Sequence, residues 1–325
     1  MINNIQILRA FAAINVVVVH ALYYSSIYKY ESNFLNFLSG WGSNGIDLFF
    51  VISGFIIFHT QINNKKNIFE FIKLRLARIV PCYWIITLFY IITYYLFPNL
   101  FNNLKINTAI IFQSLFFFSQ SISGTYPLVN VGWTLEYEIF FYLLFSFFLI
   151  FKELNIFFIN IVFFSLILLI KNYLFLEFLF GVNVAYFYNR KNLSNKNGFI
   201  FFIIGFASLI LSIKSIGVFR IENVIDRIFY WGIPSLLIVL GLIYCKKFNN
   251  KFLIFLGNAS YSIYLTHFIF IACYYKTISF FLVNFNHDLM IILSILLSIS
   301  LGSLFYIFIE KPISNFLKNK IILKN

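Results

Sequence analysis

Apolar stretches of about 20 residues recur along this 325-residue chain and restrict the folds open to it. A stretch of that length spans the hydrocarbon core of a bilayer as a helix, with some tolerance for tilt. Ten such stretches begin near Ile5, Gly45, Pro81, Trp133, Asn155, Tyr173, Gly198, Ile228, Ala259 and Asp288. Hydrophobic residues make up 61% of the chain and charged residues 11%, unlike soluble domains. We therefore predict an all-α polytopic membrane protein with about ten transmembrane helices.

Basic residues gather in alternate connections between these stretches, as the positive-inside rule expects of cytoplasmic loops. The connections assigned to the cytoplasm hold Lys65, Lys66, Lys73, Arg75, Arg78, Lys152, Arg190, Lys191, Lys196, Lys246, Lys247 and Lys251. The opposite connections hold fewer, namely Lys29, Lys105, Lys171, Lys214, Arg220, Arg227 and Lys276. This pattern needs ten spans with both termini in the cytoplasm, and it leaves the short run from Thr108 to Ser119 as a re-entrant or interfacial segment. It also accounts for the net charge of +13 without nucleic-acid binding.

The chain offers little room for a second domain or a metal site. No long polar segment separates the apolar stretches, so we expect one transmembrane domain over residues 1–325 with no appended soluble domain. Cys82, Cys245 and Cys273 are widely separated and lack a metal-ligand spacing. We therefore expect neither a disulfide framework nor a bound metal.

Two ionisable residues share one face of the first apolar stretch. Arg9 and His20 are eleven residues apart, which on a helix returns to within about 20° of the same face after a rise of about 16.5 Å. An ionisable group deep in a bilayer costs roughly 2.5–3.5 kcal/mol on insertion scales. Such groups usually face a protein interior or a watery cavity and often mark a functional site.

Four titratable residues fall at similar predicted depths near the outer ends of their helices. His20 lies roughly 6 Å inside the first span, Asp47 about 4 Å inside the second and Glu138 about 7 Å inside the fifth, with Glu177 at a similar depth in the seventh. A histidine beside a carboxylate is the arrangement that general-base catalysis needs. The alternatives are a structural membrane histidine and an Asp47 that only caps a helix.

Arginines near the inner ends suggest an anion site. Arg9 could hold an anionic cofactor with its planar guanidinium, or it could extend to the lipid headgroups. Arg75 and Arg78 lie three residues apart on one helical face of the connection between Gln61 and Val80. A phosphate-bearing cofactor would suit that patch, although orientation in the membrane also explains its charge.

Several motifs in order resemble the acyltransferase-3 family of integral-membrane acyltransferases. Arg9 and His20 at their spacing are followed by Gly45-Ile-Asp47-Leu-Phe-Phe-Val-Ile-Ser53-Gly54-Phe, Arg75-Leu-Ala-Arg78-Ile-Val-Pro81, Trp133-Thr-Leu-Glu-Tyr-Glu138-Ile-Phe-Phe141-Tyr142, Glu177-Phe-Leu-Phe-Gly181, Ser260-Tyr261-Ser262-Ile-Tyr264-Leu-Thr-His267 and Glu310-Lys-Pro312. The likeness runs from about Ile5 to Pro312. Gly132-Trp-Thr and Ile79-Val-Pro-Cys-Tyr-Trp84 look closest to the branch that decorates exopolysaccharides. Thr134 and Ala10 depart mildly from the family pattern.

The resemblance implies transfer of an acyl group, usually acetyl, from acyl-coenzyme A to a sugar hydroxyl of a surface polysaccharide or its lipid-linked precursor, in a bacterial inner membrane. Arg9, Arg75 and Arg78 would then receive the coenzyme phosphates. His20 would act as the general base or form an acyl-imidazole, with Asp47 or Glu138 to orient it. The residues expected to contact the acceptor are Trp133, Glu177, Tyr261 and His267. His267 could also serve as a packing or pore-lining group, and Tyr261 as an interfacial tyrosine.

Two other classes of function remain open from sequence. A transporter or flippase for a lipid-linked glycan would also carry buried charges along a substrate path, although no internal repeat is evident. A structural partner in a polysaccharide assembly complex would use its polar groups to join helices. In that last case Arg9 and His20 would tolerate conservative replacement.

Overall fold

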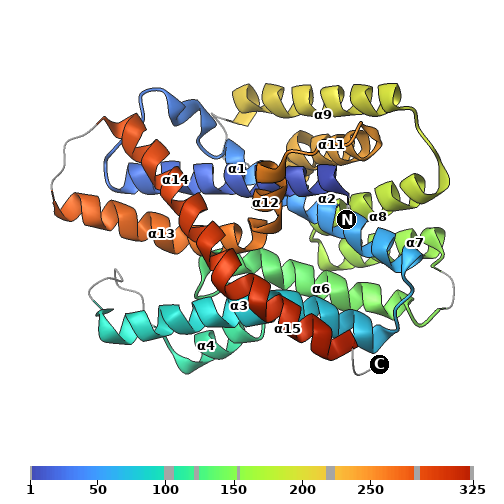
Figure 1. Ribbon diagram of the computed structural model, residues 1–325, viewed down its shortest axis with the longest axis horizontal. Helices are drawn as coiled ribbons and strands as arrows, with labels where there is room; N and C mark the ends of the chain where they lie inside the picture. Colours follow the sequence, from blue (N-terminus) through green and yellow to red (C-terminus); the bar gives the residue numbers. More distant parts are fainter. Residues whose placement is uncertain are drawn as a thin grey trace. The chain divides into compact units, whose positions relative to one another are not determined.

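The computed structural model describes residues 2–98, 106–120, 124–151, 154–216, 224–281 and 286–322, and within those ranges it holds helices and no strands (Figure 1). The prediction of an all-α membrane protein is confirmed. Seven helical segments are long and apolar enough to cross a membrane. An eighth is the pair α12 (Lys251–Asn258) and α13 (Ser260–Phe280) if the two helices, which meet at 69°, count as one span. The count of ten stays a prediction.

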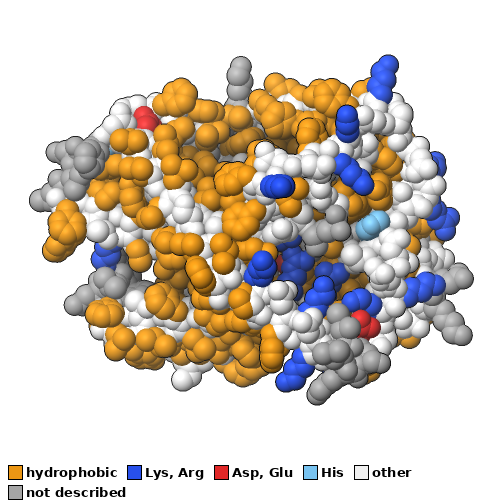
Figure 2. Space-filling view, in the orientation of Figure 1, with side chains coloured by type: hydrophobic (Ala, Val, Ile, Leu, Met, Phe, Trp, Pro, Cys, Tyr) orange, Lys and Arg blue, Asp and Glu red, His pale blue; other side chains and the backbone are white. Residues whose placement is uncertain are grey.

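The helices group into two compact units, and each is described by itself. The first unit comprises Met1–Lys65 and Glu153–Ser303, and the second comprises Lys66–Lys152 and Leu304–Asn325. Apolar side chains cover much of the face seen in Figure 2. Since a bilayer is an apolar solvent for that surface, this exposure is what a membrane protein requires.

The first unit holds the helices that carry most of the predicted site. They are α1 (Asn3–Ile27), α2 (Asn44–Asn63), α7 (Ile156–Ile170), α8 (Phe175–Arg190), α9 (Asn195–Ile216), α10 (Val224–Arg227), α11 (Ile233–Tyr244), α12, α13 and most of α14 (His287–Phe305). A π-helical turn, η5 (Ile228–Gly232), joins α10 to α11. Helix α1 packs against α2, α12 and α13, and α2 packs against α8.

Glycines let α2 and α8 approach closely. A Cβ atom at Gly54 would lie 2.0 Å from the Phe178 carbonyl oxygen, and one at Gly181 would lie 2.0 Å from the Val51 carbonyl oxygen. Small residues at such crossings bring helix backbones together in membranes. The close packing at α2 aligns the start of that helix, where Asp47 lies, with the start of α8, where Glu177 lies.

Replacing Gly54 with alanine should therefore lower the stability of the folded protein by about 1–3 kcal/mol, since the new methyl group must displace backbone rather than a mobile side chain. The thermal midpoint in detergent measures this effect. Ala207→Leu is the control, because Ala207 is exposed on α9 and its added methyl groups displace no backbone, so the midpoint should change little. Equal losses in the two variants would contradict the packing role of Gly54.

The second unit corrects one predicted boundary. Its elements are α3 (Ile68–Leu96), α4 (Thr108–Leu115), η4 (Asn130–Gly132), α6 (Trp133–Phe148), η6 (Tyr306–Glu310) and α15 (Lys311–Ile322). The third span was expected to begin near Pro81, but α3 begins at Ile68, where the Asn67 side chain accepts a hydrogen bond from Glu70 N and caps the helix. Pro81 lies inside the helix. Arg75 and Arg78 therefore belong to α3 itself rather than to a loop.

Candidate active site

Two histidines from different helices meet in the first unit. His267 Nε2 on α13 lies 3.2 Å from His20 Nδ1 on α1, and the ring centroids are 4.9 Å apart. His267 is fully buried, whereas His20 is partly exposed. The sequence predicted both residues as site residues without predicting their contact, because the distance between α1 and α13 cannot be read from sequence.

The backbone around each ring favours one arrangement of protons. His20 Nδ1 lies 2.9 Å from the Val16 carbonyl oxygen, and His267 Nδ1 lies 3.2 Å from the Ile263 carbonyl oxygen. A carbonyl only accepts, so each Nδ1 carries a proton in the assignment that satisfies both contacts. His267 Nε2 then accepts from His20 Nδ1–H. His20 Nε2 keeps its lone pair and has no hydrogen-bond partner among the residues that the structure describes.

Aromatic rings surround the histidine pair. The Phe268 ring meets His20 edge-on at 6.0 Å, and the Tyr264 ring lies 5.9 Å from that of His267. Tyr264 in turn lies 5.9 Å from Phe49 on α2, near the start of the helix that carries Asp47. Rings at these separations make favourable contacts and keep the imidazoles in a fixed orientation.

Asp47 forms a two-point ion pair that the sequence did not predict. Arg227 Nε and Nη2 each donate to one Asp47 carboxylate oxygen at 2.9 Å, and Nη2 also lies 3.3 Å from the Ser43 carbonyl oxygen. The Asp47 side chain is fully buried, and the Arg227 side chain is 16% exposed. The guanidinium also lies over the Trp231 ring at 5.2 Å. The sequence pattern places Arg227 in an outer connection, although a buried Asp47 requires a cationic partner.

Glu177 lies beside this ion pair. It is fully buried and within electrostatic range of Asp47 and Arg227, and neither of its carboxyl oxygens makes a hydrogen bond of acceptable geometry within the described ranges. A Cβ at Gly232 would lie 3.1 Å from Glu177 Oε1, so η5 covers the carboxyl group. The Arg227 guanidinium therefore lies near two buried carboxyl groups. Its hydrogen bonds to side chains go to Asp47.

Replacing Glu177 with glutamine should leave the thermal midpoint in detergent unchanged or raise it, because the neutral amide removes a carboxyl group from the vicinity of Asp47. Asp47→Asn should instead lower the midpoint, since Arg227 then loses its anionic partner. A Glu177→Gln variant as unstable as Asp47→Asn would show that Arg227 depends on both carboxyl groups.

A second cluster lies within the second unit, where α3 packs against α6. The Tyr142 hydroxyl donates to Glu138 Oε1, and the Arg75 guanidinium lies 5.5 Å from the Phe71 ring and 5.8 Å from the Tyr142 ring. Arg75 interacts electrostatically with Arg78 and Glu138. The predicted depths place Glu138 in the outer layer and Arg75 in an inner connection. That separation is wrong, because α3 begins thirteen residues earlier than expected and carries Arg75 into the span.

The remaining predicted residues occupy separate places. Arg9 is 6% exposed, and its Nη1 donates to Gln6 Oε1 at 3.2 Å, so its side chain is buried rather than extended to a lipid surface. Tyr261 is buried on α13. Trp133 opens α6 in the second unit and meets the Tyr137 ring edge-on at 5.6 Å. The roles assigned to these residues stay predictions.

The first unit thus contains two histidines in hydrogen-bonding contact and, at the start of α2, an Arg–carboxylate ion pair. The second unit contains two arginines with a carboxylate. An imidazole can take part in acid–base chemistry, and a pair of guanidinium groups can hold phosphate. Within the described ranges, no group of three or more His, Cys, Asp or Glu residues could hold a metal ion.

Comparison with known proteins agrees with this chemistry. The acyltransferase-3 model, described as an acyltransferase domain, matches residues 2–309. An exopolysaccharide production protein, ExoZ of Rhizobium meliloti (strain 1021), is 38% identical over 108 residues, which cover 32% of this chain and 33% of that protein. The chain thus matches about a third of the length of this curated relative. No solved structure matches.

Proposed function

We propose that this chain, which belongs to the acyltransferase-3 family, moves an acyl group from acyl-coenzyme A to a sugar hydroxyl of a surface polysaccharide or its lipid-linked precursor. The family supplies the reaction class, and the partial likeness to an exopolysaccharide production protein supports the polysaccharide acceptor. We take the acyl group to be acetyl and the location to be a bacterial inner membrane, with both termini in the cytoplasm. The observation that carries the proposal is the unengaged Nε2 of His20 within the described structure, backed by His267 at 3.2 Å.

In the proposed reaction, His20 Nε2 takes the proton of the acceptor hydroxyl as its oxygen attacks the thioester carbonyl. The new C–O bond forms and the C–S bond breaks, so that the products are the sugar ester and the coenzyme A thiolate. The imidazolium of His20 then returns its proton to the thiolate. During the step, Nδ1–H of His20 donates toward the Val16 carbonyl and His267 Nε2, which stabilises the positive charge.

This assignment changes the residue that orients the base. Asp47 or Glu138 was expected to hold His20, yet Asp47 is engaged by Arg227 and Glu138 accepts from Tyr142. We propose His267 for that role instead. Arg9, Arg75 and Arg78 remain our candidates for the coenzyme phosphates, since guanidinium groups bind phosphate through paired hydrogen bonds.

The function is tested in cells that lack the gene. Wild type and His20→Ala are returned on a plasmid, their insertion in the membrane is checked by immunoblot, and the O-acyl signals of the surface glycan are measured by proton NMR. We expect wild type to restore the ester and His20→Ala to export polymer without it. A deletion strain that loses the polymer itself would favour a flippase. Normal ester with an inserted His20→Ala protein would remove His20 from the mechanism.

A further inference from the structure

A pocket of about 390 Å³ lies between α9 and α11 in the first unit, apart from the histidine pair and the Asp47 ion pair. Its lining residues are Asn195, Lys196, Phe199, Phe202, Leu242, Cys245, Lys246 and Phe248. The volume falls within the range of about 300–1,000 Å³ that is usual for small-molecule sites. The reaction proposed above assigns nothing to this pocket.

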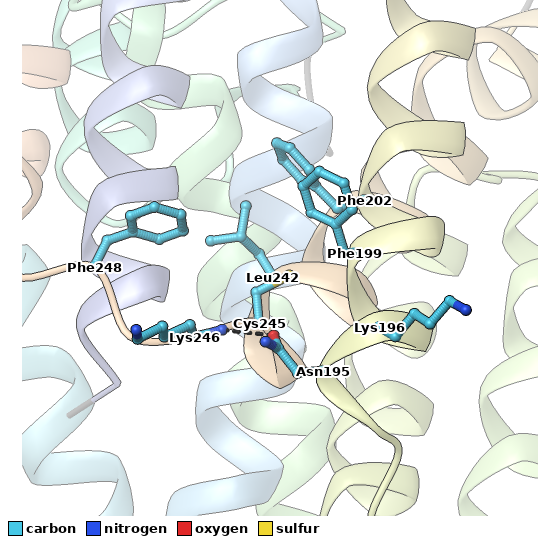
Figure 3. Close-up of a pocket in the computed structure, with 8 residues that line it drawn as sticks. All are labelled: Asn195, Lys196, Phe199, Phe202, Leu242, Cys245, Lys246 and Phe248. Carbon is cyan, nitrogen blue, oxygen red and sulfur yellow. Dashed lines mark hydrogen bonds between the residues drawn. The ribbon is translucent and has the colours of Figure 1, made fainter.

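Charge and apolar surface are separated along the pocket. Figure 3 shows the rings of Phe199 and Phe202 on one side and Asn195, Lys196 and Lys246 on the other, with the two lysines extending in opposite directions. Asn195 and Lys196 begin α9, and Phe199 and Phe202 follow on its next two turns. A ligand with an anionic group and an apolar tail would match this order, with the tail directed along the helices.

Hydrogen bonds from a buried side chain hold the backbone that forms one wall of the pocket. The Asn4 side chain, which is 1% exposed, donates to the carbonyl oxygens of Leu242, Cys245 and Lys246 at 2.7, 3.3 and 3.2 Å, and its oxygen accepts from Phe248 N at 2.9 Å.

The two helices are also fixed against each other. Lys246 N donates to the Asn195 side chain at 2.8 Å (dashed in Figure 3). A Cβ at Gly241 would lie 2.3 Å from Phe202 N, so α9 and α11 approach closely above the pocket.

The pocket also faces the surroundings of the protein rather than its core. The described spanning part of α9 is the least buried of the seven candidate spans, at 22%. Its exposed large apolar side chains beyond Phe199 are Ile200, Ile203, Ile204, Phe206, Ile210 and Leu211. A face of this composition is suited to hydrocarbon, so the pocket opens where a helix leaves the lipid core and the lysines begin.

We infer that this pocket binds one anionic phospholipid, with its phosphate near Asn195, where Lys196 and Lys246 extend to either side, and the upper part of an acyl chain against Phe199, Phe202 and Leu242. Basic residues near a membrane surface attract anionic lipids, and we expect each lysine that lines the pocket to contribute about fivefold to the affinity for the bound lipid. Lys191, Lys247 and Lys251 lie close in sequence but are not among the residues that line the pocket.

The test measures lipid retention by native mass spectrometry of the full chain, purified in detergent with equal amounts of phosphatidylglycerol and phosphatidylcholine. We expect wild type to retain one phosphatidylglycerol in preference to phosphatidylcholine. Lys196→Gln/Lys246→Gln should lower that preference roughly 25-fold, or about fivefold per lysine. Lys247→Gln/Lys251→Gln removes the same charge outside the pocket lining and should retain most of the preference.

Two further measurements distinguish a bound phospholipid from free phosphate and from coenzyme A. Inorganic phosphate at millimolar concentration should not displace the lipid, because it lacks the tail that the rings bind. Coenzyme A that displaces the lipid, with a raised KM for the acyl donor in the Lys196→Gln/Lys246→Gln variant, would identify a donor site instead. Equal lipid retention in the two double variants would also overturn the inference. Since it does not depend on the acyl-transfer proposal, a protein without transferase activity could still pass this test.

Discussion

Replacing His20 with alanine is expected to lower the rate of acyl transfer by about 10²–10⁴-fold, the usual contribution of a general base. The expectation rests on the geometry of the ring, since Nδ1 is held by the Val16 carbonyl and His267 while Nε2 has no partner in the described structure. The measurement is transfer of radiolabelled acetyl from acetyl-coenzyme A to glycan in membrane vesicles. His20→Ala should also lose the fall in rate at acidic pH that protonation of the base causes in wild type.

His267 should behave as a positioning residue. Its Nε2 accepts from His20, and a lost hydrogen bond to a charged group is worth about 1.5–3 kcal/mol. His267→Leu should therefore lower kcat roughly 10–100-fold while the KM for the acyl donor stays unchanged. In His267→Gln an amide oxygen can replace Nε2 as the acceptor, so this variant should recover part of the rate.

His59 offers a matched control. It lies near the end of α2 in the same unit, with its Nδ1 3.2 Å from the Asn189 side-chain oxygen. His59→Gln should keep wild-type kcat and the wild-type pH profile. If His267→Leu kept wild-type kcat, or if His20→Ala kept the acidic fall in rate, the assignment of base and positioning residue would be wrong.

The helical class of this protein could be predicted from sequence because the bilayer imposes length and composition on each span. The start of α3 could not, since the basic residues between Gln61 and Val80 read as a loop. In the structure the Asn67 cap begins the helix at Ile68, and Arg75 lies over the rings of Phe71 and Tyr142. The cost of an arginine in a span is reduced when aromatic rings and a nearby carboxylate surround it.

The partners of the predicted site residues are harder to predict from sequence than the residues themselves. His20, Asp47 and Glu177 stood out because ionisable groups are rare in apolar stretches. Arg227, which pairs with Asp47, did not stand out, because it lies just before the run that begins at Ile228 and resembled a loop charge. Asp47 and Arg227 are 180 positions apart, so their pairing depends on how the helices pack. The local sequence around either residue does not predict that packing.

Replacing Arg227 with methionine is expected to destabilise the folded protein by about 3–5 kcal/mol, the cost of leaving one member of a buried ion pair without its partner. Asp47 is fully buried, and both of its carboxylate oxygens accept hydrogen bonds from Arg227. The variant therefore leaves the Asp47 carboxylate without a cationic partner and beside a second carboxyl group, that of Glu177. Against a total stability of about 5–15 kcal/mol, this loss is large. The measurement is the thermal midpoint in detergent, monitored by size-exclusion chromatography after heating.

A second substitution distinguishes the ion pair from simple loss of side-chain volume. Asp47→Leu combined with Arg227→Met removes both charges, and replacing a buried pair by apolar groups is often neutral or stabilising, so the double variant should recover most of the lost stability. Arg190→Met is the matched control, because Arg190 is exposed and lies over the Tyr186 ring at 4.7 Å, and it should change stability by less than about 1 kcal/mol. A double variant no more stable than Arg227→Met would mean that the Arg227 side chain stabilises the start of α2 through Ser43 and Trp231 rather than through Asp47.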